Sequence, residues 1–443
     1  MRSMKRYAQN SLNNWKDSPN RRPLLLYGAR QVGKTWLVRN FAANEYDDLI
    51  ELNLLTDDSL KAVFAKDITP VRIIQQLELR FNRKIDPART LLFFDEIQES
   101  QRAMDALKSF NDAGREYNIV AAGSFLGVML GRRPVGQTDQ ITLFPMSFCE
   151  FLEAIGRKIP AETIKQRDSG ALSGISDLLE SLLKQYFYVG GMPAAVCEYA
   201  ESGDLTKVRE IQNGLLLSYK GDFSKHINDP RTEPKIRILW DSISLHLVRE
   251  NKKFVYKNVK AGGRAAEFET AMQWLVDTGL IYKINKVETP KIPLKMHYKE
   301  DFFKLFMLDI GLLGAQAEIK PADILAAGRD IVDDMNGALA EQFVCQELKA
   351  AKVSPLLYWG RQSSTAEVDF LTQDNGEIIP IEVKSAKHTK SQSLKVYMQE
   401  YKPKHAIRTS LKNYGVVDNL YSVPLYMISQ LPGIIGGKKE PLE

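Results

Sequence analysis

The N-terminal part of the chain alternates short apolar runs with amphipathic stretches. Residues 23–27, 90–95 and 118–124 are dominated by apolar side chains without polar alternation, a pattern that predicts buried strands of a parallel sheet. Residues 36–43 have the spacing of a helix. Strands that alternate with helices predict a three-layer α/β domain, and such a domain binds its ligand at the carboxyl ends of the strands.

A glycine-rich segment connects the first predicted strand to the first predicted helix. It reads Gly-Ala-Arg-Gln-Val-Gly-Lys-Thr, which fits G-x-x-x-x-G-K-T. Glycines let backbone N–H groups surround phosphates, Lys34 would reach the β- and γ-phosphates, and the Thr35 hydroxyl would ligate Mg²⁺. A chance glycine-rich turn is the alternative, but the strand and helix around the segment favour an ATP site. The predicted nucleotide-binding residues are Gly28, Ala29, Arg30, Gln31, Val32, Gly33, Lys34, Thr35 and Trp36.

Two carboxylates and one hydroxyl follow the other two predicted strands. Asp95 and Glu96 end the run Thr-Leu-Leu-Phe-Phe-Asp-Glu, and Ser124 ends the run Asn-Ile-Val-Ala-Ala-Gly-Ser. Asp95 would hold Mg²⁺ through water, and Glu96 would act as general base toward the attacking water. Ser124 could sense the γ-phosphate. The alternatives are a solvated loop for the carboxylate pair and a simple strand-end cap for Ser124.

The order of these elements resembles bacterial and archaeal AAA+-like ATPases. Two further stretches contribute to the resemblance, Leu143-Phe-Pro-Met-Ser-Phe-Cys-Glu-Phe151 and Gly190-Gly-Met-Pro193. The resemblance implies that Ser124 is sensor 1. It also implies an arginine finger, for which Arg132 and Arg133 are candidates, although a solvated basic loop is an equal alternative. Such cores often take this arginine from a neighbouring copy, so a homo-oligomer is expected.

The pattern changes within residues 231–298. Two helical segments, a glycine-containing loop, a helix over 264–278 and a strand or wing over 280–287 are typical of a winged helix. The helix over 264–278 would occupy the recognition position and could enter a DNA major groove. The residues considered for this helix and for phosphate contacts are Arg264, Glu267 and Trp274, with Lys252, Lys253, Lys257 and Lys260.

A packing role is the equal alternative for this winged helix, which would then act as a lid on the ATPase. Glu267 and Glu269 place negative charge on the proposed recognition helix. Trp274 and Leu275 have the helical spacing of core residues and are expected to be buried.

The C-terminal part of the chain combines acidic residues and a lysine on predicted helices and strands. Glu341 belongs to an amphipathic helical stretch, Asp369 to the strand Glu-Val-Asp-Phe-Leu, and Glu382 and Lys384 to the strand Ile-Ile-Pro-Ile-Glu-Val-Lys. Glu382 and Lys384 share one face of their strand because side chains alternate with a period of two. Asp369 and Glu382 could bind a second Mg²⁺ or a Mn²⁺, and Lys384 could steady the hydrolytic water or the developing charge.

This part of the chain resembles the PD-(D/E)XK nuclease superfamily, specifically the domain of unknown function that follows this ATPase type. The matching stretches are Phe303-Lys-Leu-Phe-Met-Leu-Asp-Ile-Gly-Leu-Leu313, Tyr358-Trp-Gly-Arg361 and Glu367-Val-Asp-Phe370. The alternatives are strands with ordinary charge alternation, and a nuclease fold that only binds nucleic acid. Further residues that could contact phosphate, or simply solvate a helix entry, are Lys387, His388 and Lys390.

Composition restricts the class of protein without deciding its function. The chain has 443 residues and a net charge of +5, a mild excess that is compatible with nucleic acid. Its N-terminus lacks the apolar core of a signal peptide, and no long apolar stretch predicts a membrane span, so a cytoplasmic protein without a membrane partner is expected. The three cysteines, far apart and set among apolar residues, are expected to be buried.

These patterns together predict an α/β protein of three modules. Residues 1–230 form a P-loop ATPase domain with a helical extension, 231–298 a winged helix, and 299–443 a restriction-endonuclease-like domain. The leading function is a DNA-associated ATPase with a metal-dependent, nuclease-like C-terminal domain. The alternative is a nucleotide-dependent switch or scaffold with slow hydrolysis, no cleavage and a protein partner. A small-molecule kinase is a third possibility, but no acceptor pocket or lid motif follows the P-loop.

Overall fold

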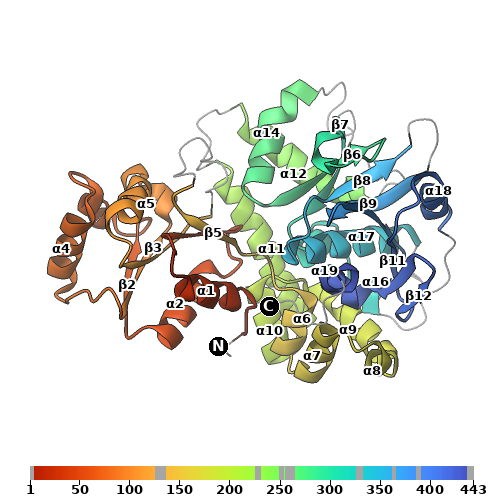
Figure 1. Ribbon diagram of the computed structural model, residues 1–443, viewed down its shortest axis with the longest axis horizontal. Helices are drawn as coiled ribbons and strands as arrows, with labels where there is room; N and C mark the ends of the chain where they lie inside the picture. Colours follow the sequence, from red (N-terminus) through yellow and green to blue (C-terminus); the bar gives the residue numbers. More distant parts are fainter. Residues whose placement is uncertain are drawn as a thin grey trace. The chain divides into compact units, whose positions relative to one another are not determined.

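The computed structural model describes most of the chain as two compact units. The described residues are 4–124, 136–224, 231–248, 254, 265–325, 333–361, 366–385 and 391–436. The N-terminal unit contains Lys5–Phe144 and Asp277–Gly279, and the C-terminal unit contains Pro145–Val276 and Leu280–Leu442. Figure 1 labels the helices and strands of both units.

The N-terminal unit is built on a five-stranded sheet in the order β2-β3-β4-β1-β5. Every neighbouring pair in this sheet is parallel. The strands are β1 (Leu24–Tyr27), β2 (Asp48–Asn53), β3 (Thr90–Asp95), β4 (Asn118–Ala122) and β5 (Asp139–Thr142). The helices are α1 (Ala8–Asp17), α2 (Lys34–Glu45), α3 (Asp58–Lys61), α4 (Pro70–Phe81) and α5 (Gln101–Ala113), with short 3₁₀ helices η1 (Ala62–Phe64) and η2 (Ile97–Glu99).

Helices cover both faces of this sheet, so the predicted three-layer arrangement is confirmed. On one face, Leu92 and Phe94 of β3 form a core with apolar residues of α4 and α5, including Phe110. Helix α2 packs against β2, β3 and β4, while every residue of β3 is buried. Strands buried on both faces read as continuous apolar runs, which is why the sequence pattern located β1, β3 and β4 correctly.

The C-terminal unit begins with a run of helices. Between residues 145 and 222 these are α6 (Phe148–Ala154), α7 (Lys158–Gln166), α8 (Ser169–Ser173), α9 (Ser176–Val189), α10 (Pro193–Ser202) and α11 (Leu205–Asp222). Farther along the chain are α12 (Glu233–Val248), α14 (Ala265–Asp277), α15 (Ile310–Gln316), α16 (Pro321–Leu325), α17 (Asp333–Ala350), α18 (Gln392–Tyr401) and α19 (Leu431–Ile435), with 3₁₀ helices η4 (Leu294–Met296) and η5 (Leu425–Gln430).

An eight-stranded mixed sheet runs through this unit in the order β12-β13-β11-β10-β9-β8-β6-β7. Its strands are β6 (Ile281–Val287), β7 (Tyr298–Met307), β8 (Leu357–Gly360), β9 (Glu367–Asp374), β10 (Glu377–Val383), β11 (Ala406–Ser410), β12 (Gly415–Val417) and β13 (Leu420–Pro424). β6 pairs with β7 antiparallel and with β8 parallel. The β6–β7 hairpin therefore continues the sheet that carries the C-terminal acidic strands.

The β6–β7 hairpin spans one of the predicted module boundaries. The predicted division between residues 298 and 299 falls at the start of β7, within one continuous sheet. The predicted strand over 280–287 is β6, and the predicted helix over 264–278 includes α14. Trp274 and Leu275 are buried, which confirms the prediction that they are core residues. The winged helix itself, and the three-module division, stay predictions.

Two expectations from composition can be compared with the structure. Cys149 and Cys345 are buried as expected, whereas Cys197 is partly exposed, because it lies on α10 with a side of that helix open to solvent. Within the described residues, no helix combines the length and the apolar character needed to cross a bilayer.

A buried polar node joins the Gly-Gly-Met-Pro stretch to the segment after β7. Asp309 accepts a hydrogen bond from the Gly191 N–H at 2.6 Å and caps α15 by accepting one from the Leu312 N–H at 3.0 Å. A Cβ on Gly191 would lie 2.1 Å from the Met146 carbonyl oxygen, so only glycine fits there. Burial raises the pKa of Asp309 to about 6, although these hydrogen bonds oppose the shift.

Helix α17 supplies a second buried carboxyl beside this node. Glu347 accepts a hydrogen bond from the Phe148 N–H, at the start of α6, at 2.9 Å. Burial raises the pKa of Glu347 to about 8, against an ordinary value of 4.5. The folded chain therefore keeps this proton up to a pH of about 8, while the unfolded chain releases it near pH 4.5. The stability contributed by the group is complete below pH 4.5 and is lost as the pH rises toward 8.

We predict that Glu347→Gln becomes more stable relative to the wild type as the pH rises from 5 to 8. Glutamine keeps an oxygen for the Phe148 N–H but has no proton to lose, so the advantage should reach the order of a few kcal/mol at pH 8. Urea unfolding across this pH range measures it. Glu210→Gln, exposed on α11, is the matched control and should show no such trend. A Glu347→Gln difference that stays constant with pH would contradict the prediction.

Candidate functional site

The glycine-rich segment between β1 and α2 forms a tight loop. Gly28 has a φ of +146° and Gly33 a φ of +96°, values that favour glycine. A Cβ on Gly28 would lie 2.4 Å from the Leu143 carbonyl oxygen, so the loop also needs glycine there for close packing. Helix α2 begins at Lys34, directly after Gly33. The backbone N–H groups of the loop and of the first turn of α2 are thus available to an anion.

Lys34 links this loop to the end of β4. Its Nζ donates to the carbonyl oxygens of Gly28 and Ala29, both at 2.9 Å, and to Ser124 Oγ at 3.1 Å. Burial lowers the pKa of Lys34 to about 8, and the nearby carboxylates of Glu96 and Asp95 oppose that shift. Phosphate oxygens would offer this buried ammonium the negative charge that the two carbonyl groups lack.

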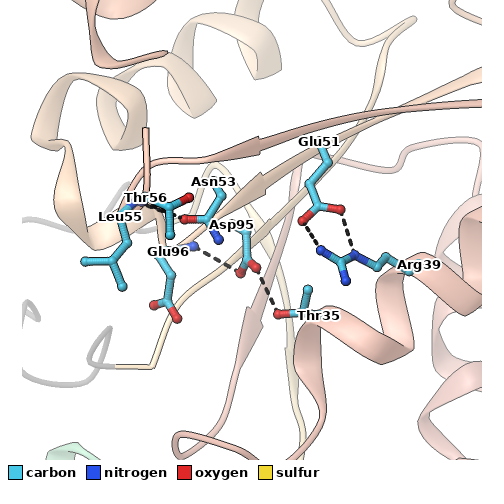
Figure 2. A network of polar contacts seen from close by, with 8 residues as sticks. All are labelled: Thr35, Arg39, Glu51, Asn53, Leu55, Thr56, Asp95 and Glu96. Atoms are coloured by element: carbon cyan, nitrogen blue, oxygen red, sulfur yellow. Dashed lines mark hydrogen bonds and ion pairs between the residues drawn. The ribbon is translucent and has the colours of Figure 1, made fainter. Parts of the chain in front are cut away.

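Asp95 links the same loop to the end of β3. Thr35 Oγ1 donates to Asp95 Oδ2 at 2.8 Å, and the Glu96 N–H donates to Asp95 Oδ1 at 3.0 Å. Figure 2 shows Asp95 with its carboxylate turned toward the Thr35 hydroxyl. Burial raises the pKa of Asp95, while the hydrogen bond from Thr35 opposes the shift. A hydroxyl and a carboxylate side by side are hard oxygen ligands, so these two residues fit Mg²⁺.

Glu96 occupies an unusual backbone conformation next to this pair. Its φ of +51° lies in the left-handed region, which is uncommon for a residue with a side chain. The Gln98 side-chain amide donates to Glu96 Oε2 at 2.6 Å and holds the carboxylate in one orientation. The predicted residues Lys34, Thr35, Asp95, Glu96 and Ser124 therefore meet at the carboxyl edge of the parallel sheet.

The predicted C-terminal site draws on one helix and two strands. Glu341 lies on α17, Asp369 on β9 and Glu382 on β10, and Lys384 follows β10 directly. Lys384 Nζ lies 2.8 Å from Glu382 Oε1, and the Val383 N–H donates to Asp369 Oδ2 at 2.8 Å. The antiparallel pairing of β9 and β10 thus brings Asp369, Glu382 and Lys384 together, as the strand pattern predicted.

A lysine that sequence reasoning missed lies among these acidic residues. Lys304 of β7 is fully buried, and its Nζ lies 2.7 Å from Glu367 Oε1, 3.2 Å from Glu341 Oε2 and 3.7 Å from Asp369 Oδ1. We call Glu341, Glu367 and Asp369 the carboxylate cluster. Burial alone would lower the pKa of Lys304, but the cluster outweighs it and raises the pKa well above its usual value. The lysine within the apolar run Phe-Phe-Lys-Leu-Phe-Met was the available signal.

Glu382 lies beside the carboxylate cluster and is also buried. Burial raises the pKa of Glu382, and the neighbouring Lys384 opposes that shift. Its second oxygen, Oε2, is buried and has no hydrogen-bond partner among the described residues. Within that same part of the chain, no group of three or more His, Cys, Asp or Glu side chains is arranged to hold a metal ion. The predicted second Mg²⁺ or Mn²⁺ at Asp369 and Glu382 thus finds no support.

Several predicted residues lie outside the described part of the chain. These are the arginine-finger candidates Arg132 and Arg133, the basic residues Lys252, Lys253, Lys257, Lys260 and Arg264, and the residues Lys387, His388 and Lys390. Their predicted roles stay predictions.

Comparison with known proteins agrees with the geometry of the loop. Residues 20–152, which include β1, the glycine-rich loop and the ends of β3 and β4, match the family model of an AAA domain. The chain contains an AAA-type P-loop ATPase domain. Residues 180–323 and 336–428 match two domains of unknown function, DUF8612 and DUF4143. Among curated proteins the comparison finds no match.

Solved structures resemble the chain at low sequence identity. The Walker-type ATPase PABY2304 of Pyrococcus abyssi is 15% identical over 71% of this chain and 96% of its own, with a TM-score of 0.45. RuvB of Thermotoga maritima is 14% identical over 64% and 89%, with a TM-score of 0.29. PCH-2 of C. elegans is 13% identical over 34% and 44%, with a TM-score of 0.22.

Two further residues that the sequence did not reveal hold backbone segments near the site of the ATPase domain. The buried guanidinium of Arg6 donates to the Val32 carbonyl at 2.8 Å and to the Phe144 carbonyl at 2.6 Å. On the other side, the Asn53 side chain accepts hydrogen bonds from the N–H groups of Leu55 and Thr56, at 3.1 and 3.0 Å, next to Asp95 (Figure 2). Arg6 therefore fixes the backbone of the loop, and Asn53 fixes the turn beside the β3 end.

We predict that Arg6→Ala weakens ATP binding by about tenfold or more, because hydrogen bonds from a charged donor contribute about 1.5–3 kcal/mol and the loop backbone must be held in place to receive phosphate. Equilibrium binding of a fluorescent ATP analogue measures the effect. Lys5→Ala, at the exposed neighbouring position, is the control. Equal affinity in Arg6→Ala and Lys5→Ala would show that the loop holds its shape without the guanidinium.

Proposed function

We propose that this protein is an ATP-hydrolysing molecular switch, in which the AAA-type domain binds ATP with Mg²⁺ and its nucleotide state controls a protein partner. The observation that carries the ATPase assignment is the 2.8 Å hydrogen bond between Thr35 Oγ1 and Asp95 Oδ2. Thr35, the predicted Mg²⁺ ligand, and Asp95, predicted to hold Mg²⁺ through water, thus lie side by side at the end of the glycine-rich loop, which supports the assignment. A homo-oligomer, which would allow a neighbouring copy to supply an arginine, is part of the proposal.

Each residue at this edge would have one task. Lys34 would exchange its two carbonyl partners for the β- and γ-phosphate oxygens of ATP while staying near Ser124, which would sense the γ-phosphate. Glu96, oriented by Gln98, would take a proton from the attacking water. When bound by Thr35 and Asp95, Mg²⁺ would neutralise charge that develops on the phosphates. The P-loop backbone would orient the triphosphate.

The second candidate is the DNA-associated enzyme with a metal-dependent, nuclease-like C-terminal domain. It is favoured by the approach of Asp369 to the end of β10, where Glu382 lies and which Lys384 follows, since this arrangement suits phosphodiester chemistry. The ammonium of Lys304 lies among the carboxylates of the cluster. Because it competes with a divalent metal for the same oxygens, it favours the switch over the metal-dependent nuclease. Binding to duplex DNA at increasing salt concentration distinguishes the two candidates. For a DNA-associated enzyme, the logarithm of the binding constant should fall steeply and linearly with the logarithm of the salt concentration.

We predict that Glu96→Gln binds ATP with wild-type affinity but hydrolyses it about 10²–10⁴-fold more slowly, since it lacks the general base. Steady-state phosphate release with Mg²⁺, together with ATP binding, measures both properties. Glu99→Gln, a nearby carboxylate on η2, is the matched control and should turn over normally. If Glu96→Gln retains turnover within a few-fold of the control, another group is the base. If the wild type neither binds nor hydrolyses ATP, the proposed function is wrong.

A further inference from the structure

Lys304 lies where a divalent metal would have to lie to use the carboxylate cluster. Its Nζ is within 4 Å of carboxylate oxygens from both α17 and β9, at 3.2, 2.7 and 3.7 Å for Glu341, Glu367 and Asp369. A Mg²⁺ or Mn²⁺ ion needs several oxygens that converge at about 2.0–2.6 Å on one point. An ammonium and a divalent ion cannot share that point, because both are positive and each needs the same oxygens.

Other acidic oxygens next to the cluster also have partners. Asp369 Oδ2 accepts the Val383 N–H, and Glu382 Oε1 is paired with Lys384. Glu382 Oε2 is the acceptor that has no partner among the described residues. A single carboxylate oxygen is far short of the coordination that Mg²⁺ or Mn²⁺ demands, so it does not form a metal site by itself.

The surrounding structure keeps Lys304 in this position. Its side chain is fully buried, and the Nζ lies 5.2 Å from the centre of the Tyr358 ring. Farther along β7, the Met307 N–H donates to Gln342 Oε1 at 2.9 Å, and Gln342 Nε2 donates to the Met307 carbonyl at 2.7 Å. Because Gln342 follows Glu341 on α17, this pair of hydrogen bonds fixes the strand of Lys304 against the helix of one of its partners.

We propose that the ammonium of Lys304 is the built-in cation of the carboxylate cluster, and that it takes the place of a divalent metal among Glu341, Glu367 and Asp369. The C-terminal unit then has the residues of a metal-dependent nuclease but binds no metal at this cluster. The acidic side chains join β7, α17 and β9 through an internal ion cluster. This inference concerns a different site from the ATPase and stands or falls independently of it.

Metal binding to the full chain tests the proposal directly. The variant Thr35→Ala/Asp95→Asn removes the Mg²⁺ ligands of the ATPase domain, so any remaining site lies elsewhere. The concentration of free Mn²⁺ is measured by electron paramagnetic resonance in the absence of nucleotide. We expect this variant to bind no stoichiometric Mn²⁺ at concentrations up to about 1 mM. One Mn²⁺ per chain that disappears when Asp369→Asn or Glu382→Gln is added would overturn the proposal.

Removal of the ammonium supplies the second test. In the same background, Lys304→Met leaves the cluster without its cation, so its thermal midpoint should be lower and should rise when Mn²⁺ is added. The unsubstituted background should not respond. Lys299→Met, on the exposed part of β7, is the matched control and should behave like the background. Lys304→Met that is as stable as Lys299→Met without added metal would refute the proposal. If Lys304→Met does not fold, the Mn²⁺ titration of the background decides alone.

Discussion

The placement of β4 between β1 and β3 is the constraint on which the chemistry of the N-terminal unit depends. The P-loop follows β1, Asp95 and Glu96 lie at the end of β3, and Ser124 follows β4. These three parts of the site are therefore distant in the sequence. Parallel pairing with a register that matches Leu24 to Val120 and Leu92 to Ile119 brings their carboxyl ends to one edge. Lys34 then reaches Ser124, and Thr35 reaches Asp95.

The local part of this arrangement could be predicted from the sequence. Continuous apolar runs identify strands that are buried on both faces, and G-x-x-x-x-G-K-T between a strand and a helix identifies a phosphate loop. Arg6 could not be identified in this way. Its acceptors lie 26 and 138 residues away, and an arginine near the N-terminus looks like a solvated residue until the loop and the end of β5 are in place around it.

In the C-terminal unit, too, local patterns predicted part of the site but did not reveal a residue that long-range strand pairing positions. Alternation with a period of two predicted that Glu382 and Lys384 share a face, and the neighbouring strand predicted Asp369 beside them. The position of Lys304 depends on β7 and β6 joining the same sheet, a long-range fact that no local pattern contains. An expectation of bound metal therefore followed from the acidic residues, since the sequence does not show that a buried ammonium contacts three of the carboxylates.

The continuity of the sheet across β6 and β7 also decides how the protein can be divided for study. A fragment that follows the 336–428 family match contains every carboxylate of the cluster but not Lys304, which belongs to the preceding strand. In such a fragment the three carboxylates would lack their buried ammonium, beside a sheet that has lost β6 and β7. Any divalent-metal binding by these carboxylates would then be a property of the fragment and not of the whole protein. Activity of this domain therefore has to be measured on chains that include β7.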